Sequence, residues 1–206
     1  MDTWTMLAEA RTDLANYLET LTDEQWNAQS LCGEWRVRDV VGHIVEATRK
    51  FPWGGLITGM FKAGFNIDKM VATSAKQEGA KSTEQLLKEL REGADSRALP
   101  PGVKAEGIVG DVVVHTQDIR RALGAPGSIP QDRLRAVLDY ESKQGRFLPN
   151  KKRIAGLKLR ATDIDWTIGE GSEVAGPGEA LLMAMCGRKV ALDDLAGDGV
   201  ATLRTR

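Results

Sequence analysis

The chain has 206 residues, of which 42% are hydrophobic and 28% charged, and its formal net charge at pH 7 is −1. This length allows one large domain, or a domain of ordinary size with a small second one. The near-neutral charge gives no preference for a polyanion such as nucleic acid, and no run of about 18 apolar residues predicts a membrane-spanning helix.

The first residues, "MDTWTMLAEARTDL", do not have the pattern of a secretory signal, because no basic segment is followed by an apolar one. Cys32 and Cys186 are too few for a disulfide framework, and neither has a CxxC partner. We therefore expect a cytoplasmic protein with free thiols, and we expect Cys186 to be a core residue of an apolar helix.

The chain opens with an amphipathic helix over residues 4–20. Its leucines recur at helical spacing, and its charged residues lie elsewhere around the helix: Glu9, Arg11, Asp13 and Glu19. Thr22 and Gln25 then form a capping box, which predicts the start of a short helix. A loop is expected over residues 30–35, "SLCGEW".

A second long helix is expected to begin near Val37 and to end at Pro52, because proline cannot continue a helix. The following stretch, residues 53–66, is rich in glycine and aromatic residues and is typical of a connection. A third helical region covers about residues 67–98, and within it a helix restarts at a capping box that begins with Ser82.

The next helix is expected over about residues 105–123, with Gly124 ending it. A further helix is predicted from a cap at Ser128, with Gln131 completing the capping box and an end near Gly145. Four or five of these helices are long enough to build a bundle.

The pattern changes after "LPNKKR". "GLKLRATD" alternates like a half-exposed strand, "DWTIG" and "SEVAG" are strand-like, "GPGEALLMAMCG" predicts a compact helix, and "GVATLRTR" predicts a last strand. We expect a mainly α protein, with a four-helix bundle over residues 1–148 and a small α+β domain over residues 149–206. The small domain is expected to pack on the bundle, because so few residues bury little core alone.

A narrow polar stripe runs along the helix expected at 105–123. Asp111, His115 and Asp118 share one face, because they lie at positions i, i+4 and i+7. Apolar residues flank them on both sides: Val112, Val113, Val114 and Ile119. This pattern predicts a polar stripe that faces a cavity inside the bundle.

A carboxylate four residues before a histidine can place an oxygen and an imidazole nitrogen on one metal ion. His43, the other histidine, lies in a similar apolar helical setting, with Glu46 three residues later. Spacing alone leaves two interpretations open. The two helices share a metal site, or the histidines are buried core residues with satisfied nitrogens, one of them paired with Asp111.

Two stretches, "SLCGEWRVRDVVGHIV" and "DVVVHTQDIRRALG", resemble motifs of the mycothiol-dependent maleylpyruvate isomerase family, within the wider DinB-like metal-binding bundles. The matching residues of the first motif are Leu31, Cys32, Trp35, Val37, Asp39, Val40 and His43. "LRATDIDWTIGEG", "GPGEALLMAMCGR" and "LAGDGVATL" resemble the family's small C-terminal domain, which is similar to a sterol-carrier fold. The resemblance covers nearly the whole chain and is specific in the order and spacing of its motifs.

The resemblance implies a divalent metal ion, typically zinc, held by His43, Asp111 and His115. The family usually has glutamate at the position of Asp111, and the shorter aspartate shifts the metal or leaves the contact to a water molecule. Arg188 matches an arginine of the family's C-terminal domain, and the resemblance implies that it can bind a substrate carboxylate, although near a helix end it can also satisfy carbonyl groups. Asp118 suits a role in orienting His115, and the alternative is that it caps contacts between the two domains.

Three protein ligands leave one zinc position open, as in catalytic sites. The resemblance implies that mycothiol, the thiol cosubstrate, loses its proton at such a site and attacks a small electrophile, in an isomerase or an S-transferase. Two alternatives stay open. One is a non-catalytic protein that binds a metal or ligand, and the other is a metal-dependent hydrolase that uses a bound water.

Cysteine and aromatic residues near these motifs have two possible roles each. Cys32 is a packed loop cysteine, or a fourth ligand or reactive thiol, and we expect the first. The aromatic residues Trp35, Trp53 and Phe61 pack in the core or line a pocket, and core packing is again the expectation.

Overall fold

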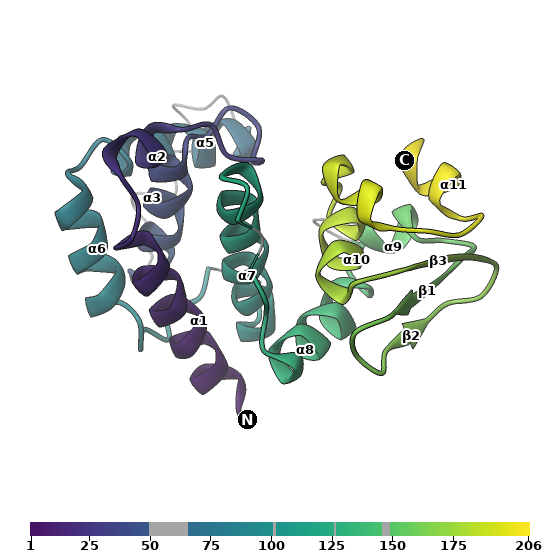
Figure 1. The fold of residues 1–206 in the computed structure, drawn as a ribbon. Coiled ribbons are helices and arrows are strands. Elements are labelled where there is room, and N and C mark those ends of the chain that lie inside the picture. The colour runs from purple at the N-terminus through teal and green to yellow at the C-terminus, as the bar shows by residue number, and fades with distance from the viewer. Residues whose placement is uncertain (50–65, 101, 126, 146–148) are drawn as a thin grey trace. The chain divides into compact units, whose positions relative to one another are not determined.

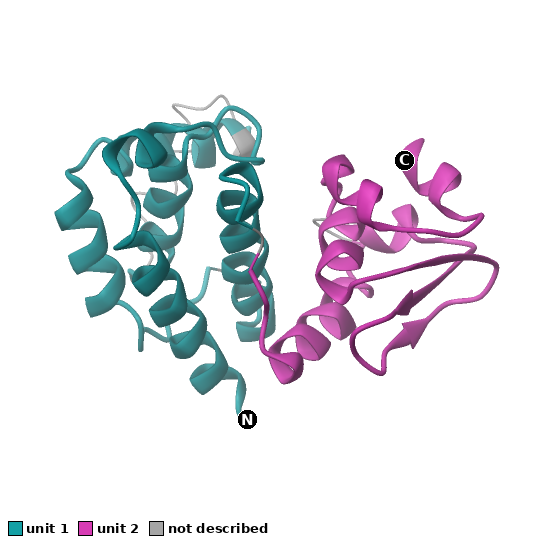
Figure 2. Ribbon diagram, viewed as in Figure 1, with its two compact units in different colours: residues 1–126 teal, residues 127–206 magenta. Residues whose placement is uncertain are grey.

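The protein is described by a computed structural model over residues 1–49, 66–100, 102–125, 127–145 and 149–206. The chain divides into two compact units, unit 1 over residues 1–126 and unit 2 over residues 127–206 (Figure 2). Most of the connection expected at 53–66, including Trp53 and Phe61, lies outside the described residues.

Unit 1 is helical throughout its described elements (Figure 1). They are α1 (Thr3–Leu18), α2 (Asp23–Asn27), α3 (Val37–Ala47), α5 (Ile67–Glu78), α6 (Thr83–Glu92) and α7 (Ala105–Ala122). Helix α1 packs against α6 and α7, and α3 packs against the same two helices, so these four close a bundle. Helix α5 packs on α3. The predicted four-helix bundle is confirmed.

The ends of the helices follow the local sequence. The Asp2 side chain accepts hydrogen bonds from the amides of Trp4 and Thr5 and so caps α1. Thr22 and Gln25 form the predicted capping box at α2. Helix α7 is followed by Gly124, whose φ of +69° lies in the left-handed region that favours glycine.

The start of α3 is fixed by an exchange between Arg36 and Asp39. The Asp39 carboxylate, only 1% exposed, accepts from the backbone amide of Arg36 and from its guanidinium group, each at 3.0 Å. One turn later Gly42 lets α3 approach α5, because a Cβ there would lie 2.6 Å from the backbone nitrogen of Gly79. Both features hold the helix segment that carries His43.

Unit 2 combines a small sheet with short helices. Its elements are α8 (Gln131–Glu141), α9 (Asn150–Arg153), β1 (Leu157–Ala161), β2 (Thr167–Ile168), β3 (Ser172–Gly176), α10 (Gly178–Met185), the 3-10 helix η1 (Lys189–Asp194) and α11 (Val200–Arg204). The strand order is β2-β1-β3, with β1 antiparallel to β2 and parallel to β3. Helix α10 packs on β1 and β3 and also contacts α8 and η1.

The two units divide the chain earlier than the sequence analysis expects. The expected boundary follows residue 148, and residues 146–148 lie outside the described part of the chain. Helix α8 groups with unit 2, because it packs against α10. The apolar face of α8 includes Leu134 and Leu138, both buried.

Two predictions for unit 2 are wrong, namely the cap of α8 and the type of the last element. Helix α8 begins at Gln131 with Pro130 as its N-cap and no side-chain cap, so Ser128 does not cap it. The predicted last strand is the helix α11 instead. Its buried Leu203 lies three residues after Val200, which is helical spacing, and the amide of Leu203 donates to the carbonyl of Gly199.

The second long helix, α3, ends at Ala47 in the described part of the chain, while Pro52, its expected end, is not among the described residues. Among the described residues, no helix has both the length and the apolar character needed to cross a membrane.

Candidate metal centre

The three residues implied as metal ligands come together in unit 1. His43 lies in the middle of α3, and Asp111 and His115 lie one turn apart on α7, the neighbouring helix of the bundle. The Nε2 atom of His43 is 3.4 Å from Oδ2 of Asp111, and the Nε2 atom of His115 is 3.4 Å from Oδ1 of the same carboxylate. One donor atom from each residue lies within 4.8 Å of the other two.

These distances fit a divalent metal ion. Ligand atoms at about 2.0–2.1 Å from a tetrahedral zinc ion lie about 3.3 Å from one another. The observed Nε2–oxygen distances of 3.4 Å are of that length, and they run to the two different oxygens of the Asp111 carboxylate. Two imidazole nitrogens and a carboxylate oxygen are also donors that zinc accepts. The residues therefore fit the group that the sequence analysis implies.

Asp118 holds the ring of His115 from the other side. Its Oδ2 atom lies 3.0 Å from Nδ1 of His115, and both residues are buried, with exposed fractions of 0% and 8%. A proton on Nδ1 that is donated to this carboxylate leaves Nε2 directed at Asp111. The polar stripe predicted on this helix is therefore present, and the cavity expected beside it stays a prediction.

The facing charges of the stripe shift the pKa values of Asp111 and His115 in opposite directions. Partial burial alone raises the pKa of Asp111, but the facing His115 and His43 outweigh it and hold that pKa well below its usual range. Burial alone lowers the pKa of His115, but Asp111 and the hydrogen bond to Asp118 raise it well above its usual value. In the metal-free chain an ionised Asp111 thus faces a His115 ring that holds its proton, and a metal ion bound at Nε2 of His115 would displace that proton.

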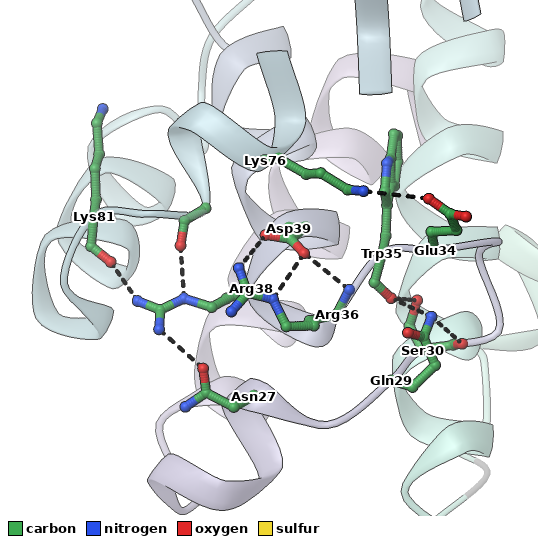
Figure 3. Close-up of polar contacts among 11 residues, drawn as sticks. Asn27, Gln29, Ser30, Glu34, Trp35, Arg36, Arg38, Asp39, Lys76 and Lys81 are labelled. Carbon is green, nitrogen blue, oxygen red and sulfur yellow. Dashed lines mark hydrogen bonds and ion pairs between the residues drawn. The ribbon is translucent and has the colours of Figure 1, made fainter. Parts of the chain in front are cut away.

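The loop between α2 and α3 places an aromatic ring against both histidines. The Trp35 ring centroid lies 5.2 Å from that of His43 and 5.9 Å from that of His115. Gln29 and Ser30 hold the loop by donating side-chain hydrogen bonds to the carbonyl oxygen of Trp35, at 2.8 and 2.7 Å (Figure 3). Trp35 therefore borders the candidate centre rather than packing in the core away from it.

The same loop is joined to α7. The backbone amide of Leu31 donates to the carbonyl oxygen of Asp118 at 3.1 Å. This bond brings the next residue, Cys32, close to His115, with a donor atom of each residue within 4.8 Å of the other. This loop carries part of the sequence motif that contains Cys32, Trp35 and His43. Because the loop lies beside α7, the residues of this motif and the polar stripe belong to one site.

Cys32 offers a second donor set that shares a histidine with the first. Cys32, His115 and Asp118 each have a donor atom within 4.8 Å of the other two. In this set the Asp118 carboxylate already bonds Nδ1 of His115, whereas the set with His43 and Asp111 has two Nε2 atoms facing one carboxylate. We therefore favour the set of His43, Asp111 and His115.

Arg188 belongs to unit 2 and is described with it. It is half-buried at the start of η1, and its Nη1 atom donates to the carbonyl oxygen of Cys186 at 2.9 Å. Since Cys186 is the C-cap of α10, the guanidinium group satisfies a helix end, as the sequence analysis allows. Its substrate-binding role stays a prediction.

One charged residue of unit 1 is not where the sequence analysis puts it. Arg11 is fully buried instead of lying on the outer side of the first helix. A signal for this is present, because Arg11 follows Leu7 by four residues and precedes Leu14 by three, which places it on the leucine face. Grouping Arg11 with the other charged residues of this helix therefore does not predict its burial.

Comparison with known proteins agrees with the sequence motifs. The family model described as the mycothiol maleylpyruvate isomerase N-terminal domain matches residues 7–120. This range contains His43, Asp111 and His115. No curated protein sequence matches the chain significantly.

Two solved structures are similar to the whole chain. One is the crystal structure of a mycothiol-dependent maleylpyruvate isomerase, with a TM-score of 0.64 and 13% identity, covering 95% of this chain and 91% of that chain. The other is a mutant of that isomerase with a histidine replaced by alanine, with the same TM-score and coverage and 12% identity. At this identity the likeness establishes the fold alone.

Proposed function

Because the chain belongs to the family of the mycothiol maleylpyruvate isomerase N-terminal domain, we propose that it is a metal-dependent enzyme that uses mycothiol as a cosubstrate to act on a small electrophile. The observation that carries this proposal is the convergence of His43, Asp111 and His115 from two helices, with donor atoms at the spacing of a zinc site. Zinc is the metal that this donor set favours.

In this proposal the three residues hold the metal and leave one coordination position open. A metal ion with an open position lowers the pKa of a thiol that binds there and so supplies a thiolate near neutral pH. Asp118 fixes the ring of His115 through Nδ1, so that Nε2 keeps its direction. The Trp35 ring packs beside both histidines and borders the centre.

The substrate class follows from the family. The structural relative is a maleylpyruvate isomerase, so we propose a small unsaturated carboxylic acid for this chain too. Isomerisation would consist of addition of the thiolate sulfur to a carbon of the double bond, rotation about the resulting single bond, and loss of the thiol. We propose that Arg188 binds a carboxylate of the substrate. In an S-transferase the same addition would be followed by protonation and release of the adduct.

The test is an activity assay on the full chain loaded with zinc. Incubated with mycothiol and maleylpyruvate, it should produce the trans isomer, and the reaction should need both the thiol and the metal. His43→Ala and His115→Ala should abolish it. Glu46→Gln is the matched control, because Glu46 lies one turn after His43 on α3 and bonds Ser74 instead of the centre.

Each other outcome selects a different function. A thiol adduct that accumulates without isomer formation indicates an S-transferase. Hydrolysis of esters or amides without added thiol indicates a hydrolase. Zinc binding without reaction against a panel of electrophiles contradicts the enzyme and leaves a metal-binding protein. Absence of zinc binding by the wild-type chain contradicts the site itself.

A further inference from the structure

Arg11 is a charged residue in the leucine core of the bundle. It is 0% exposed and is the largest fully buried side chain among the described residues. It lies on α1 between Leu7 and Leu14, which are also buried. A buried guanidinium group is costly unless its charge is compensated and its N–H groups are satisfied.

Only part of this requirement is met within the described residues. The Nη1 atom donates to the carbonyl oxygens of Gly93, Ala94 and Ser96, at 3.2, 3.2 and 2.8 Å. The Nε and Nη2 atoms are buried without a hydrogen-bond partner in the described part of the chain. The carbonyl groups are neutral, so they satisfy donors but do not compensate the charge. One edge of the guanidinium group therefore lacks an acceptor.

The compensating charge comes from the candidate centre. Helix α1 packs against α7, which carries Asp111. Burial lowers the pKa of Arg11 to about 10, and the attraction of Asp111 acts against this by raising it. Arg11 is therefore cationic at neutral pH, and Asp111 is the carboxylate that stabilises its charge.

We propose that Arg11 is a positioning residue for the metal centre, and that its Nε and Nη2 edge, which has no direct partner among the described residues, holds the Asp111 carboxylate in place through a bridging water molecule. A carboxylate that binds a metal through one oxygen leaves the other oxygen to accept a hydrogen bond. Asp111 is short, so its carboxylate stays close to α7 and has little freedom to find other donors. The inference rests on the proposed metal centre.

Arg11 could instead serve only to tie the chain after α6 to α1 through Nη1. The two roles predict different effects of replacing Arg11. If Arg11 only holds the chain after α6 against α1, replacing it changes the stability of unit 1 alone. If Arg11 positions Asp111, replacing it also changes the affinity and the geometry of the metal site. The test therefore measures both.

The first measurement is the zinc dissociation constant of the full chain, by competition with a chelator. Arg11→Met should weaken zinc binding about 10–100-fold, the range for residues that support metal ligands. Arg11→Lys, which keeps the charge, should recover part of the loss. The control is Arg133→Met, a buried arginine of unit 2, which should leave the constant unchanged. The visible spectrum of the cobalt-substituted Arg11→Lys protein should differ from that of the wild type.

The second measurement needs no metal. Urea unfolding of the metal-free wild type, Arg11→Met, Asp111→Asn and the double variant should give shifts of the midpoint that are not additive, because each single variant leaves the partner's charge uncompensated. Additive shifts would overturn the inference. If Arg11→Met does not fold, Arg11→Lys replaces it in the zinc measurement.

The two proposals fail in different ways. Unchanged zinc affinity and an unchanged cobalt spectrum in the Arg11 variants, with normal binding by the wild type, overturn the role of Arg11 and leave the proposed function standing. A wild-type chain that binds no zinc overturns the proposed function and this inference with it.

Discussion

The imidazole of His115 is held from both sides by carboxylates. Its Nδ1 atom lies 3.0 Å from Asp118 and its Nε2 atom 3.4 Å from Asp111. The ring therefore has little freedom to turn, and the direction of Nε2 is set before a metal ion binds. A ligand fixed in advance loses less entropy on binding, which makes the orientation of His115 a source of affinity.

Replacing Asp118 tests this orientation. Asp118→Asn removes the negative charge that supports His115, and zinc affinity should fall about 10–100-fold while the fold is retained. The zinc dissociation constant measures the effect, and Asp23→Asn, an exposed aspartate at the start of α2, is the control. An Asp118→Asn protein with wild-type affinity would contradict the orienting role.

The family resemblance of the sequence predicts a glutamate where this chain has Asp111. Asp111→Glu keeps a carboxylate and adds one methylene, so zinc binding should stay within about tenfold of the wild type, because carboxylate oxygens remain zinc donors. Asp111→Asn removes the charge and should weaken zinc binding by more than about 100-fold, which is the upper limit for a residue that only supports a ligand. Equal affinity of all three proteins would show that Asp111 is not a ligand.

Single residues also show how far the sequence predicts the site. The stripe of Asp111, His115 and Asp118 follows from helical periodicity, which alone decides which side chains share a face. That His43 lies opposite this stripe does not follow from periodicity, because it depends on how two helices pack, and only the family resemblance indicated it. The burial of Arg11 was not predicted, because charged residues on helices are usually exposed.

Among the helices, the junction of α3, α5 and α6 is held by charged side chains. Arg49 follows α3 and lies 2.9 Å from Glu78 of α5 and 2.5 Å from Glu89 of α6. Lys81, between α5 and α6, lies 2.7 and 2.9 Å from the same two carboxylates. Each partly exposed pair contributes about 0.2–1 kcal/mol, so the cluster matters as a network.

This cluster should weaken in acid. Burial raises the pKa of Glu78 and of Glu89, but hydrogen bonds from Arg49 and Lys81 to Glu78, and from Lys81 and Gln85 to Glu89, leave both pKa values lowered. A carboxylate with a lowered pKa contributes stability above its unfolded pKa and loses it as the pH falls through the folded pKa. The stabilisation should therefore be complete at pH 7. It should begin to fall near pH 4.5, the pKa of an ordinary glutamate, and be lost as the pH falls through the lower pKa of the folded chain.

The measurement is urea unfolding of the wild type and of the Glu78→Gln, Glu89→Gln double variant across the acid range. The variant should be less stable at pH 7, and the difference should shrink as the pH falls, with Glu92→Gln, an exposed glutamate on α6, as control. A difference that stays constant down to about pH 3 would contradict the role of these ion pairs.

The elements themselves were predicted well where the sequence has a capping box, as at α2, or a long periodic pattern, as at α1 and α7. The errors fall on short segments. The residues of α11 are compatible with a strand or a helix. The turn through Gly197 and the burial of Leu203 favour the helix. At α8 the fixed φ of Pro130 starts the helix later than the serine cap suggests.

Over the whole molecule, the candidate ligands and the candidate carboxylate-binding arginine belong to different units. His43, Asp111 and His115 lie in unit 1, and Arg188 lies in unit 2. Metal binding and substrate recognition can therefore be separated by mutation. The division after residue 126 was not predicted, because the sequence of α8 resembles that of the bundle helices and only its packing on α10 assigns it to unit 2.

Arg188→Met tests this separation. The zinc dissociation constant should not change, because the ligands lie in unit 1, whereas kcat/KM for a carboxylate substrate should fall about 10–100-fold, the value of one charge-assisted hydrogen bond. S-transfer to an uncharged electrophile should be unaffected. Arg204→Met, an exposed arginine of the same unit, is the control. Equal losses on charged and uncharged substrates would contradict a carboxylate-binding role.

Zinc X-ray absorption on the loaded full chain tests whether His43, Asp111 and His115 form a zinc centre with one position open to a thiol. Without thiol, the first shell should hold two imidazole nitrogens and oxygen donors at about 2.0–2.1 Å, with no sulfur. Added mycothiol should introduce one sulfur at about 2.3 Å. Sulfur bound before the thiol is added would point to Cys32 as a ligand, and a shell that gains no sulfur from mycothiol would contradict the account.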